Sequence, residues 1–191
     1  MDPLVYHEPW AGWLFFVSLG AWLVGELALQ AARQGERGDP SYLGMVAGSI
    51  GGTALAFVLG TNDSNRFPGP PELAVAVGVA LMWAGMAFRY WSVRVLGRAF
   101  KVTVTVDEDQ PLVERGPYSA IRHPSYTGMV VVYLGIGIAL DSWLGALAAL
   151  LLPTIAVVRR VGHEERVLRE AFGDRYAAYS ERTHRLLPGV W

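Results

Sequence analysis

One short segment of this chain brings together several residue types that can take part in chemistry. Residues 116–128 read GPYSAIRHPSYTG and lead into an apolar run of membrane length. Arg122 offers a permanent cation, and His123 offers an imidazole ring that can form hydrogen bonds. Tyr118 and Tyr126 add aromatic rings with hydrogen-bonding hydroxyl groups. The segment therefore predicts a site for chemistry at a membrane surface.

Proline and glycine shape the backbone around these side chains. Pro124 suits the first turn of a helix, where a missing N–H costs nothing, and it holds His123 just outside that helix. Gly128 lacks a side chain one turn later, so a flat ligand could approach the backbone there. A structural interpretation is also open, with Tyr118 and Tyr126 as membrane-interface aromatics and Gly128 as a contact for another helix.

A second candidate cluster stands at the end of the last apolar run. Arg160 and Glu164 are four residues apart, so they project from one face of a helix. An arginine that precedes a glutamate at this spacing supports a helix by at most about 0.3 kcal/mol. Helix stability is therefore a weak reason for the pair, and the binding of charged ligands is a better one.

The composition places both clusters in a membrane protein. Of the 191 residues, 52% are hydrophobic and 17% are charged, and the mean hydropathy is +0.30. Five windows carry almost no charge and have about the 20 residues that cross roughly 30 Å of hydrocarbon, although the fourth is near the short limit. These windows cover residues 10–32, 42–60, 73–91, 124–140 and 143–161. The sequence predicts a single all-α integral membrane domain over 1–191, with three spans in 1–91 and a catalytic region in 92–191.

The connections between the windows predict how the chain is oriented. Fifteen of the 16 Lys and Arg residues fall on one side of the membrane, and Arg66 alone falls on the other. Because basic residues accumulate on the cytoplasmic side, that side is expected to be cytoplasmic and the N-terminus to lie outside. The last two windows are separated only by Asp141 and Ser142, which predicts an antiparallel hairpin. Both candidate clusters then meet at the cytoplasmic surface.

The chain after the last window predicts an amphipathic C-terminal helix. Apolar residues within 167–179 lie on one stripe of a helix, with Gly173 as a stop inside it. This tail is expected either to lie on the membrane surface or to fold back over residues 92–123. Within that cytosolic connection, residues 101–106 are mostly β-branched and favour an extended backbone.

The composition also excludes several kinds of site. The chain has no cysteine, so it can form no disulfide, thiolate metal site or thiol nucleophile. Its four histidines are scattered, and no metal site is expected. Asp2 and Glu8 stand where a signal peptide would carry basic residues, so a cleavable signal peptide is not expected at the start. No nucleic-acid partner is expected either.

Two features of the N-terminal spans call for partners within the fold. Glu26 lies inside the first window, where an ionised carboxylate costs about 2.5 kcal/mol or more. An ion pair with Arg89 or Arg94, or a partly protonated side chain near the surface, is preferred over a catalytic role.

Glycines repeat every fourth residue of the second window, at 44, 48 and 52, and allow close helix packing. Packing inside one chain is expected, with a dimer as the alternative.

Both chemical clusters match a known pattern. Gly-Pro-Tyr-x4-His-Pro-Ser-Tyr-x-Gly at 116–128 is followed, after the hairpin, by Glu-Glu-x2-Leu-x3-Phe-Gly-x2-Tyr-x2-Tyr at 164–179, with Arg182 and Pro188 beyond. These motifs resemble the isoprenylcysteine carboxyl methyltransferase family over residues 95–189. His184 departs from the pattern, since the family usually has a proline there. The first three windows carry no signature of the family.

The resemblance implies an integral-membrane methyltransferase that uses S-adenosylmethionine and a lipophilic or prenylated acceptor entering from the bilayer. In it, Arg160 matches a substrate-side arginine, so Arg160 and Glu164 are expected to carry catalysis. It also implies cofactor contacts, with Glu164 holding ribose hydroxyls or the amino group. The expected cofactor-binding residues are Gln110, Pro111, Leu112, Val113, Tyr118, His123, Pro124, Ser125, Tyr126 and Glu164.

The implied chemistry suits these residue types. The sulfonium is already a good leaving group, so the protein chiefly has to align the reacting atoms. If the acceptor is a carboxylate, a dry site favours the reaction, and Arg160 can orient the anion by a forked contact. No nucleophilic side chain is then required.

Other functions remain open on the sequence. The leading prediction is carboxyl O-methylation of an isoprenylcysteine-like or other lipid-linked acid in a membrane. A phospholipid amine is an alternative acceptor, which would need a nearby proton acceptor. A membrane sterol-type reductase that uses NADPH is a second alternative, because such enzymes share an Arg-His region and a tyrosine-rich tail. A scaffold or carrier without activity is the least supported, since the spans lack the paired charges of an ion pathway.

Overall fold

The computed structural model of the chain describes residues 3–32, 40–99, 111–189 and 191. This part of the chain folds almost wholly into helices, and it contains no β-strand apart from one isolated bridge between Ile121 and His184. The prediction of an all-α fold is confirmed. The elements are α1 (Leu4–His7), α2 (Pro9–Ala32), α3 (Pro40–Gly60), η1 (Asp63–Asn65), α4 (Pro71–Leu96), η2 (Gly97–Ala99), η3 (Gly116–Ser119), α5 (Pro124–Ala139), α6 (Trp143–Phe172) and α7 (Asp174–Glu181).

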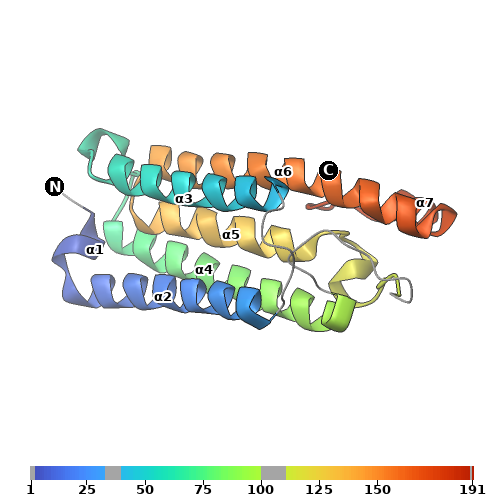
Figure 1. The fold of residues 1–191 in the computed structure, drawn as a ribbon. Coiled ribbons are helices and arrows are strands. Elements are labelled where there is room, and N and C mark those ends of the chain that lie inside the picture. The colour runs from blue at the N-terminus through green and yellow to red at the C-terminus, as the bar shows by residue number, and fades with distance from the viewer. Residues whose placement is uncertain (1–2, 33–39, 100–110, 190) are drawn as a thin grey trace.

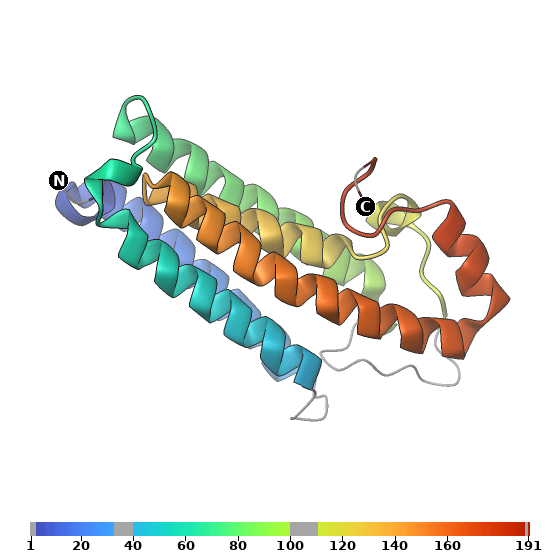
Figure 2. The same cartoon turned by 90° about the horizontal axis from the view of Figure 1, so that it is seen from above.

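The long helices form an elongated bundle (Figures 1 and 2). By length and composition, α2, α3, α4 and α6 are long and apolar enough to cross a membrane, whereas α5 has only 16 residues. α5 packs against both α4 and α6, and most of its side chains are buried. The predicted fourth window is therefore a short helix covered by protein, and the other four windows match the four long helices.

α6 is longer than its predicted window and carries the second cluster beyond the apolar part. It has 30 residues, which at 1.5 Å per residue is about 45 Å, more than the roughly 30 Å of hydrocarbon. The helix runs past residue 161 to Phe172 and ends at Gly173, whose φ of 53° is left-handed and favours glycine. The predicted stop at Gly173 is confirmed, and α7 follows it.

Glycines set the distance between neighbouring helices. A Cβ atom added at Gly128 would lie 2.7 Å from a backbone carbonyl oxygen of α4, and one added at Gly48 would lie 2.9 Å from the Ala156 Cβ of α6. The expected packing inside one chain is confirmed at Gly48 and Gly52, whereas Gly44 faces open space. The expectation that a flat ligand approaches Gly128 is wrong, because α4 fills that place.

Replacing Gly128 with alanine is expected to push α5 away from α4. The new methyl group meets backbone atoms, which cannot turn aside, so we expect a loss of about 1–3 kcal/mol. The unfolding temperature in detergent measures this loss. Gly44→Ala is the matched control, because no atom lies within 4 Å of its added Cβ, and its unfolding temperature should equal that of the native chain. Equal values for the two variants would contradict this account of the packing.

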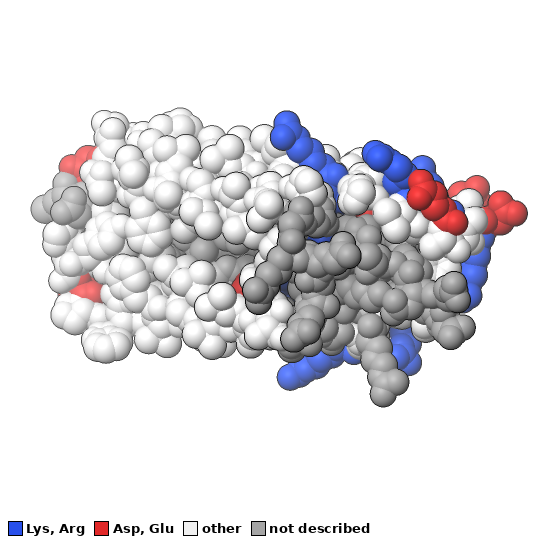
Figure 3. Space-filling view, viewed as in Figure 1, with Lys and Arg blue, Asp and Glu red and all other residues white. Residues whose placement is uncertain are grey.

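Charged side chains gather at one end of the bundle. Figure 3 shows a long surface with almost no charge between a few acidic residues at one end and a mixed charged region at the other. The second end, here called the tail end, carries η3, α7 and the C-terminus, while the N-terminus and the α5–α6 turn lie at the opposite end (Figure 2). At that opposite end, Arg66 donates to the buried carboxylate of Asp141 at 2.8 Å. The predicted extended stretch at 101–106 lies outside the described residues.

Candidate active site

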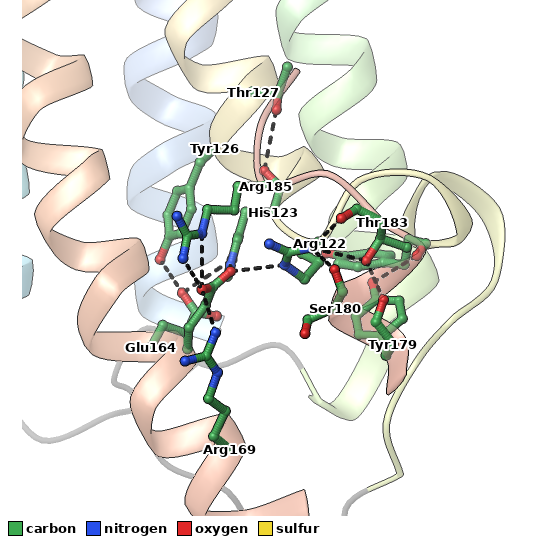
Figure 4. Close-up of polar contacts among 12 residues, drawn as sticks. Arg122, His123, Tyr126, Thr127, Glu164, Arg169, Tyr179, Ser180, Thr183 and Arg185 are labelled. Atoms are coloured by element: carbon green, nitrogen blue, oxygen red, sulfur yellow. Dashed lines mark hydrogen bonds and ion pairs between the residues drawn. The ribbon is translucent and has the colours of Figure 1, made fainter. Parts of the chain in front are cut away.

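The C-terminal tail folds back and pairs with the 116–128 motif (Figure 4). The Arg122 N–H donates to the His184 carbonyl oxygen at 2.7 Å, and the His184 N–H donates to the Ala120 carbonyl oxygen at 2.9 Å. Proline has no N–H, so a proline at position 184 could not make the second of these bonds. The tail was expected either to lie on the membrane surface or to fold back over the connection at 92–123. The structure shows the second arrangement for the described part of that connection.

Side chains fasten the same two segments together. The Tyr179 hydroxyl donates to the Tyr118 carbonyl oxygen at 2.7 Å, and the Thr127 hydroxyl donates to the Leu186 carbonyl oxygen at 2.7 Å. Burial raises the pKa of the Tyr118 and Tyr179 hydroxyls, and the negative charge of Glu164 adds to the effect at Tyr118. Both phenols therefore stay protonated. The two hydrogen bonds fasten the tail near the start and near the end of the 116–128 motif.

Glu165 is the centre of an ion cluster at this junction. Its side chain is only 4% exposed, and its Oε1 accepts from Arg122 Nε at 2.9 Å. Its Oε2 accepts from Arg185 Nε at 3.0 Å, and His123 Nε2 lies 3.5 Å from its Oε1. Because these partners come from the motif and from the tail, one carboxylate of α6 joins three segments of the chain. Glu165 is the second glutamate of the motif, and no role for it was predicted from the sequence.

Removing the charge of Glu165 is expected to release the tail. In Glu165→Gln, the guanidinium groups of Arg122 and Arg185 lose their shared anion, and breaking a buried ion pair costs about 3 kcal/mol or more. Limited digestion with trypsin should then remove the last residues of the chain about 100-fold faster than in the native protein. Glu170→Gln, at an exposed position of the same helix, should digest at the native rate. An unchanged rate in Glu165→Gln would mean that the backbone pairing alone holds the tail.

The structure brings three other predicted site residues together around Tyr126. The Tyr126 hydroxyl donates to Glu164 Oε2 at 3.0 Å and accepts from Arg160 Nε at 2.8 Å. The ring of His123 stacks on that of Tyr126 with centroids 5.9 Å apart, and its Nδ1 lies 3.8 Å from Glu164 Oε2. The Glu164 side chain is 29% exposed, whereas Arg160 is buried. A polar chain therefore leads from an accessible carboxylate to a buried guanidinium.

The other predicted cofactor-binding residues lie in more varied positions. Pro124 is buried at the start of α5, and the Ser125 hydroxyl accepts from Arg89 Nη1 at 2.7 Å, so it faces α4. Gln110 lies outside the described residues. Three residues of the connection before η3 are exposed or half-buried: Pro111, Leu112 and Val113. A role for these residues in cofactor binding stays a prediction.

A cavity of about 310 Å³ lies inside the bundle, next to Tyr126 and Arg160. Its walls come from α2, α3, α4, α5 and α6, and along α2 it extends from Trp22 to Gln30, about 12 Å at 1.5 Å per residue. Most of the lining is apolar. The cavity was not predicted from the sequence, because α2 and α3 carry no signature. The acidic Glu26 in an apolar window was its one signal.

An ion pair between α2 and α4 forms part of the cavity wall. Arg89 Nε and Nη2 donate to the two carboxylate oxygens of Glu26 at 2.5 and 2.7 Å. The third nitrogen of Arg89 donates to the Ser125 carbonyl and hydroxyl oxygens, and the guanidinium lies 5.7 Å from the centroid of the Trp22 ring. The expected structural partner of Glu26 is therefore Arg89, while Arg94 is exposed.

Known proteins resemble the chain along most of its length. The phospholipid methyltransferase family model matches residues 73–175. A probable protein-S-isoprenylcysteine O-methyltransferase of Oryza sativa subsp. indica is 28% identical over 183 residues, which cover 93% of this chain and 96% of that protein. Protein-S-isoprenylcysteine O-methyltransferase B of Arabidopsis thaliana is 28% identical over 115 residues, which cover 59% of this chain and 58% of that protein.

A solved structure shares the fold. The eukaryotic intramembrane Ras methyltransferase ICMT (isoprenylcysteine carboxyl methyltransferase) matches 81% of this chain with a TM-score of 0.57 and 22% sequence identity, and the match spans 55% of that longer chain. Four long apolar helices make the present protein a multi-pass membrane protein. Since the family model covers more than half of it, the chain belongs to the phospholipid methyltransferase family and is a membrane methyltransferase similar to the protein-S-isoprenylcysteine O-methyltransferases.

Proposed function

We propose that this protein transfers the methyl group of S-adenosylmethionine to the carboxylate of an isoprenylcysteine-like or other lipid-linked acid. The observation that carries the proposal is the polar chain from Glu164 through Tyr126 to Arg160. One end of that chain is accessible at the tail end of the bundle, and the other end lines the cavity. A place for a polar cofactor thereby adjoins a place for a lipophilic acceptor. The names of the similar proteins support the same reaction.

The side chains at the tail end fit S-adenosylmethionine. When bound, this cofactor supplies a methyl group on a positively charged sulfur. Glu164 offers an accessible carboxylate for ribose hydroxyls or an amino group, and the stacked rings of His123 and Tyr126 lie beside it, where a cation is favoured.

The cavity fits a lipid tail with an anionic head. Among the described residues that line it, the charged ones are one acid, Glu26, and two bases, Arg89 and Arg160, so this part of its wall is net positive. A carboxylate at Arg160 gains a charge-assisted and forked contact, which orients the reacting oxygen. The positive and negative charges of the reactants both disappear during methyl transfer. A site shielded from water therefore favours the reaction.

A phospholipid amine suits the cavity less well. Methylation of an amine releases a proton, so a proton acceptor is needed near the reacting nitrogen. Glu26 is the only carboxylate among the described residues that line the cavity, and both of its oxygens already accept from Arg89. Protonation of Glu26 would break this forked ion pair.

We place the tail end of the bundle in the cytoplasm. The basic side chains visible in Figure 3 gather at that end, in agreement with the excess of Lys and Arg on cytoplasmic sides of membrane proteins. The cofactor and the head of a prenylated acceptor then reach the site from the cytosol, while the acceptor's lipid tail enters from the bilayer.

Transfer of tritium from labelled S-adenosylmethionine tests the acceptor class. The native chain, purified in detergent, is incubated with N-acetyl-S-farnesylcysteine or with phosphatidylethanolamine. We expect label in the farnesyl acid, as an ester that releases volatile methanol in base. Label in the phospholipid alone, or in neither compound, would contradict the proposal.

A further inference from the structure

The cavity holds an acidic side chain that the proposed reaction does not use. Glu26 projects from α2 among apolar lining residues, and its side chain is 18% exposed. Arg89 compensates its charge, but apolar residues of similar volume would fill the same space without the cost of removing two charges from water. The pair therefore points to a role in binding.

Glu26 has acceptor positions that Arg89 does not fill. An ionised carboxylate offers about four positions for hydrogen-bond donors. Arg89 occupies one position on each oxygen, and among the described residues no other donor is bonded to Glu26. The remaining positions belong to a side chain that lines the cavity, so a bound molecule can supply the missing donor.

Glu26 and Arg160 belong to the same polar end of the cavity. Both residues line the cavity together with Tyr42, and the Arg160 guanidinium lies 5.7 Å from the centroid of the Tyr42 ring. Arg160 also donates to Tyr126, while Arg89 donates to the residue before it on α5. A head group at Arg160 is therefore within the chamber that Glu26 lines.

We propose that Glu26 accepts a hydrogen bond from an N–H group beside the acceptor carboxylate, which makes it a specificity residue for lipidated N-acyl amino acids. This inference rests on the proposed function, because the carboxylate must lie at Arg160. In an N-acyl amino acid, the N–H and the carboxylate are attached to the same carbon atom. Both can therefore reach the polar end of the cavity while the lipid tail fills the apolar part. A plain lipid acid gives Arg160 the same anion but gives Glu26 no donor.

Two acceptors with the same farnesyl tail test the inference. N-acetyl-S-farnesylcysteine has the N–H, whereas S-farnesyl-3-mercaptopropionic acid has the sulfur and the carboxylate but no nitrogen. A hydrogen bond to a charged group changes affinity by about tenfold or more. The native chain should therefore show a kcat/KM about tenfold higher for the cysteine derivative. A ratio below about twofold would overturn the inference.

Removing the charge pair tests whether Glu26 causes this preference. Glu26→Gln combined with Arg89→Gln removes both charges and leaves no unpaired arginine, and the ratio of kcat/KM values should fall to about two or less. Arg66→Gln combined with Asp141→Asn removes an ion pair at the opposite end of the bundle and should keep the native ratio. A native ratio in the Glu26 and Arg89 double variant would overturn the inference.

Binding measurements separate this inference from the proposed function. Calorimetry with the native chain, loaded with S-adenosylhomocysteine, gives the Kd of each acid without turnover. If neither acid is methylated, the proposed function fails, whereas tighter binding of the cysteine derivative by about tenfold still supports the role of Glu26. Equal Kd values would overturn that role. Glu26→Gln alone replaces the double variant if the latter does not fold.

Discussion

Replacing Arg160 with alanine is expected to lower kcat/KM for N-acetyl-S-farnesylcysteine by about 100-fold, with binding of S-adenosylhomocysteine retained. Arg160 is buried at the cavity, where it donates to the hydroxyl groups of Tyr126 and Ser41. The change removes a charge-assisted contact and also the orientation of the reacting oxygen. Arg160→Lys keeps the positive charge but loses the planar fork, so a loss of about tenfold is expected. Steady-state kinetics in detergent measure both effects.

Arg159 provides the matched control for this experiment. It is the preceding residue of α6 but is exposed. Arg159→Ala should retain kcat/KM within about twofold of the native value. Equal losses in both variants would assign the effect to the overall charge of the tail end. A native kcat/KM in Arg160→Ala would remove Arg160 from the acceptor site.

Replacing Glu164 with alanine is expected to raise the Kd of S-adenosylhomocysteine by about 30-fold. The Glu164 carboxylate accepts from Tyr126 and is the accessible end of the polar chain, so it is the proposed acceptor for the cofactor's hydroxyl or amino groups. A hydrogen bond to a charged group contributes about 1.5–3 kcal/mol, and each 1.4 kcal/mol is a tenfold change in Kd. Calorimetry on the detergent-purified chain gives this value directly, and NADPH serves as a ligand that should not bind.

Glu170 supplies the control for Glu164. It lies on the same helix, is exposed, and should bind S-adenosylhomocysteine with the native Kd after replacement by alanine. An unchanged Kd in Glu164→Ala would place the cofactor elsewhere. Binding of NADPH instead of S-adenosylhomocysteine by the native chain would favour a reductase.

Composition and periodicity predicted most of the helices. The windows at 10–32, 42–60 and 73–91 correspond to α2, α3 and α4, because about 20 residues without charge have few alternatives to a membrane-length helix. The hairpin of α5 and α6 followed from its very short connection. The apolar window ended at residue 161, whereas α6 continues to Phe172 as one helix, since apolar composition ends where water begins but a helix can continue with one apolar and one polar face.

Contacts between distant segments explain what the sequence did not reveal. Ile121 and His184 pair through backbone groups, which every residue type except proline can offer, so no motif marks the position of the tail. Glu164 and Glu165 are adjacent, but neighbours on a helix point about 100° apart, so one joins Tyr126 and the other joins the tail. The cavity uses apolar side chains of α2 and α3, which are indistinguishable in sequence from those that face lipid.

A structure with S-adenosylhomocysteine and N-acetyl-S-farnesylcysteine bound together tests the central claim most directly. The account predicts the cofactor at the tail end against Glu164, the carboxylate within hydrogen-bond distance of Arg160, and the farnesyl chain in the cavity. Tyr126 should then lie between the two ligands. A carboxylate that does not contact Arg160, or a cofactor bound inside the cavity, would contradict it.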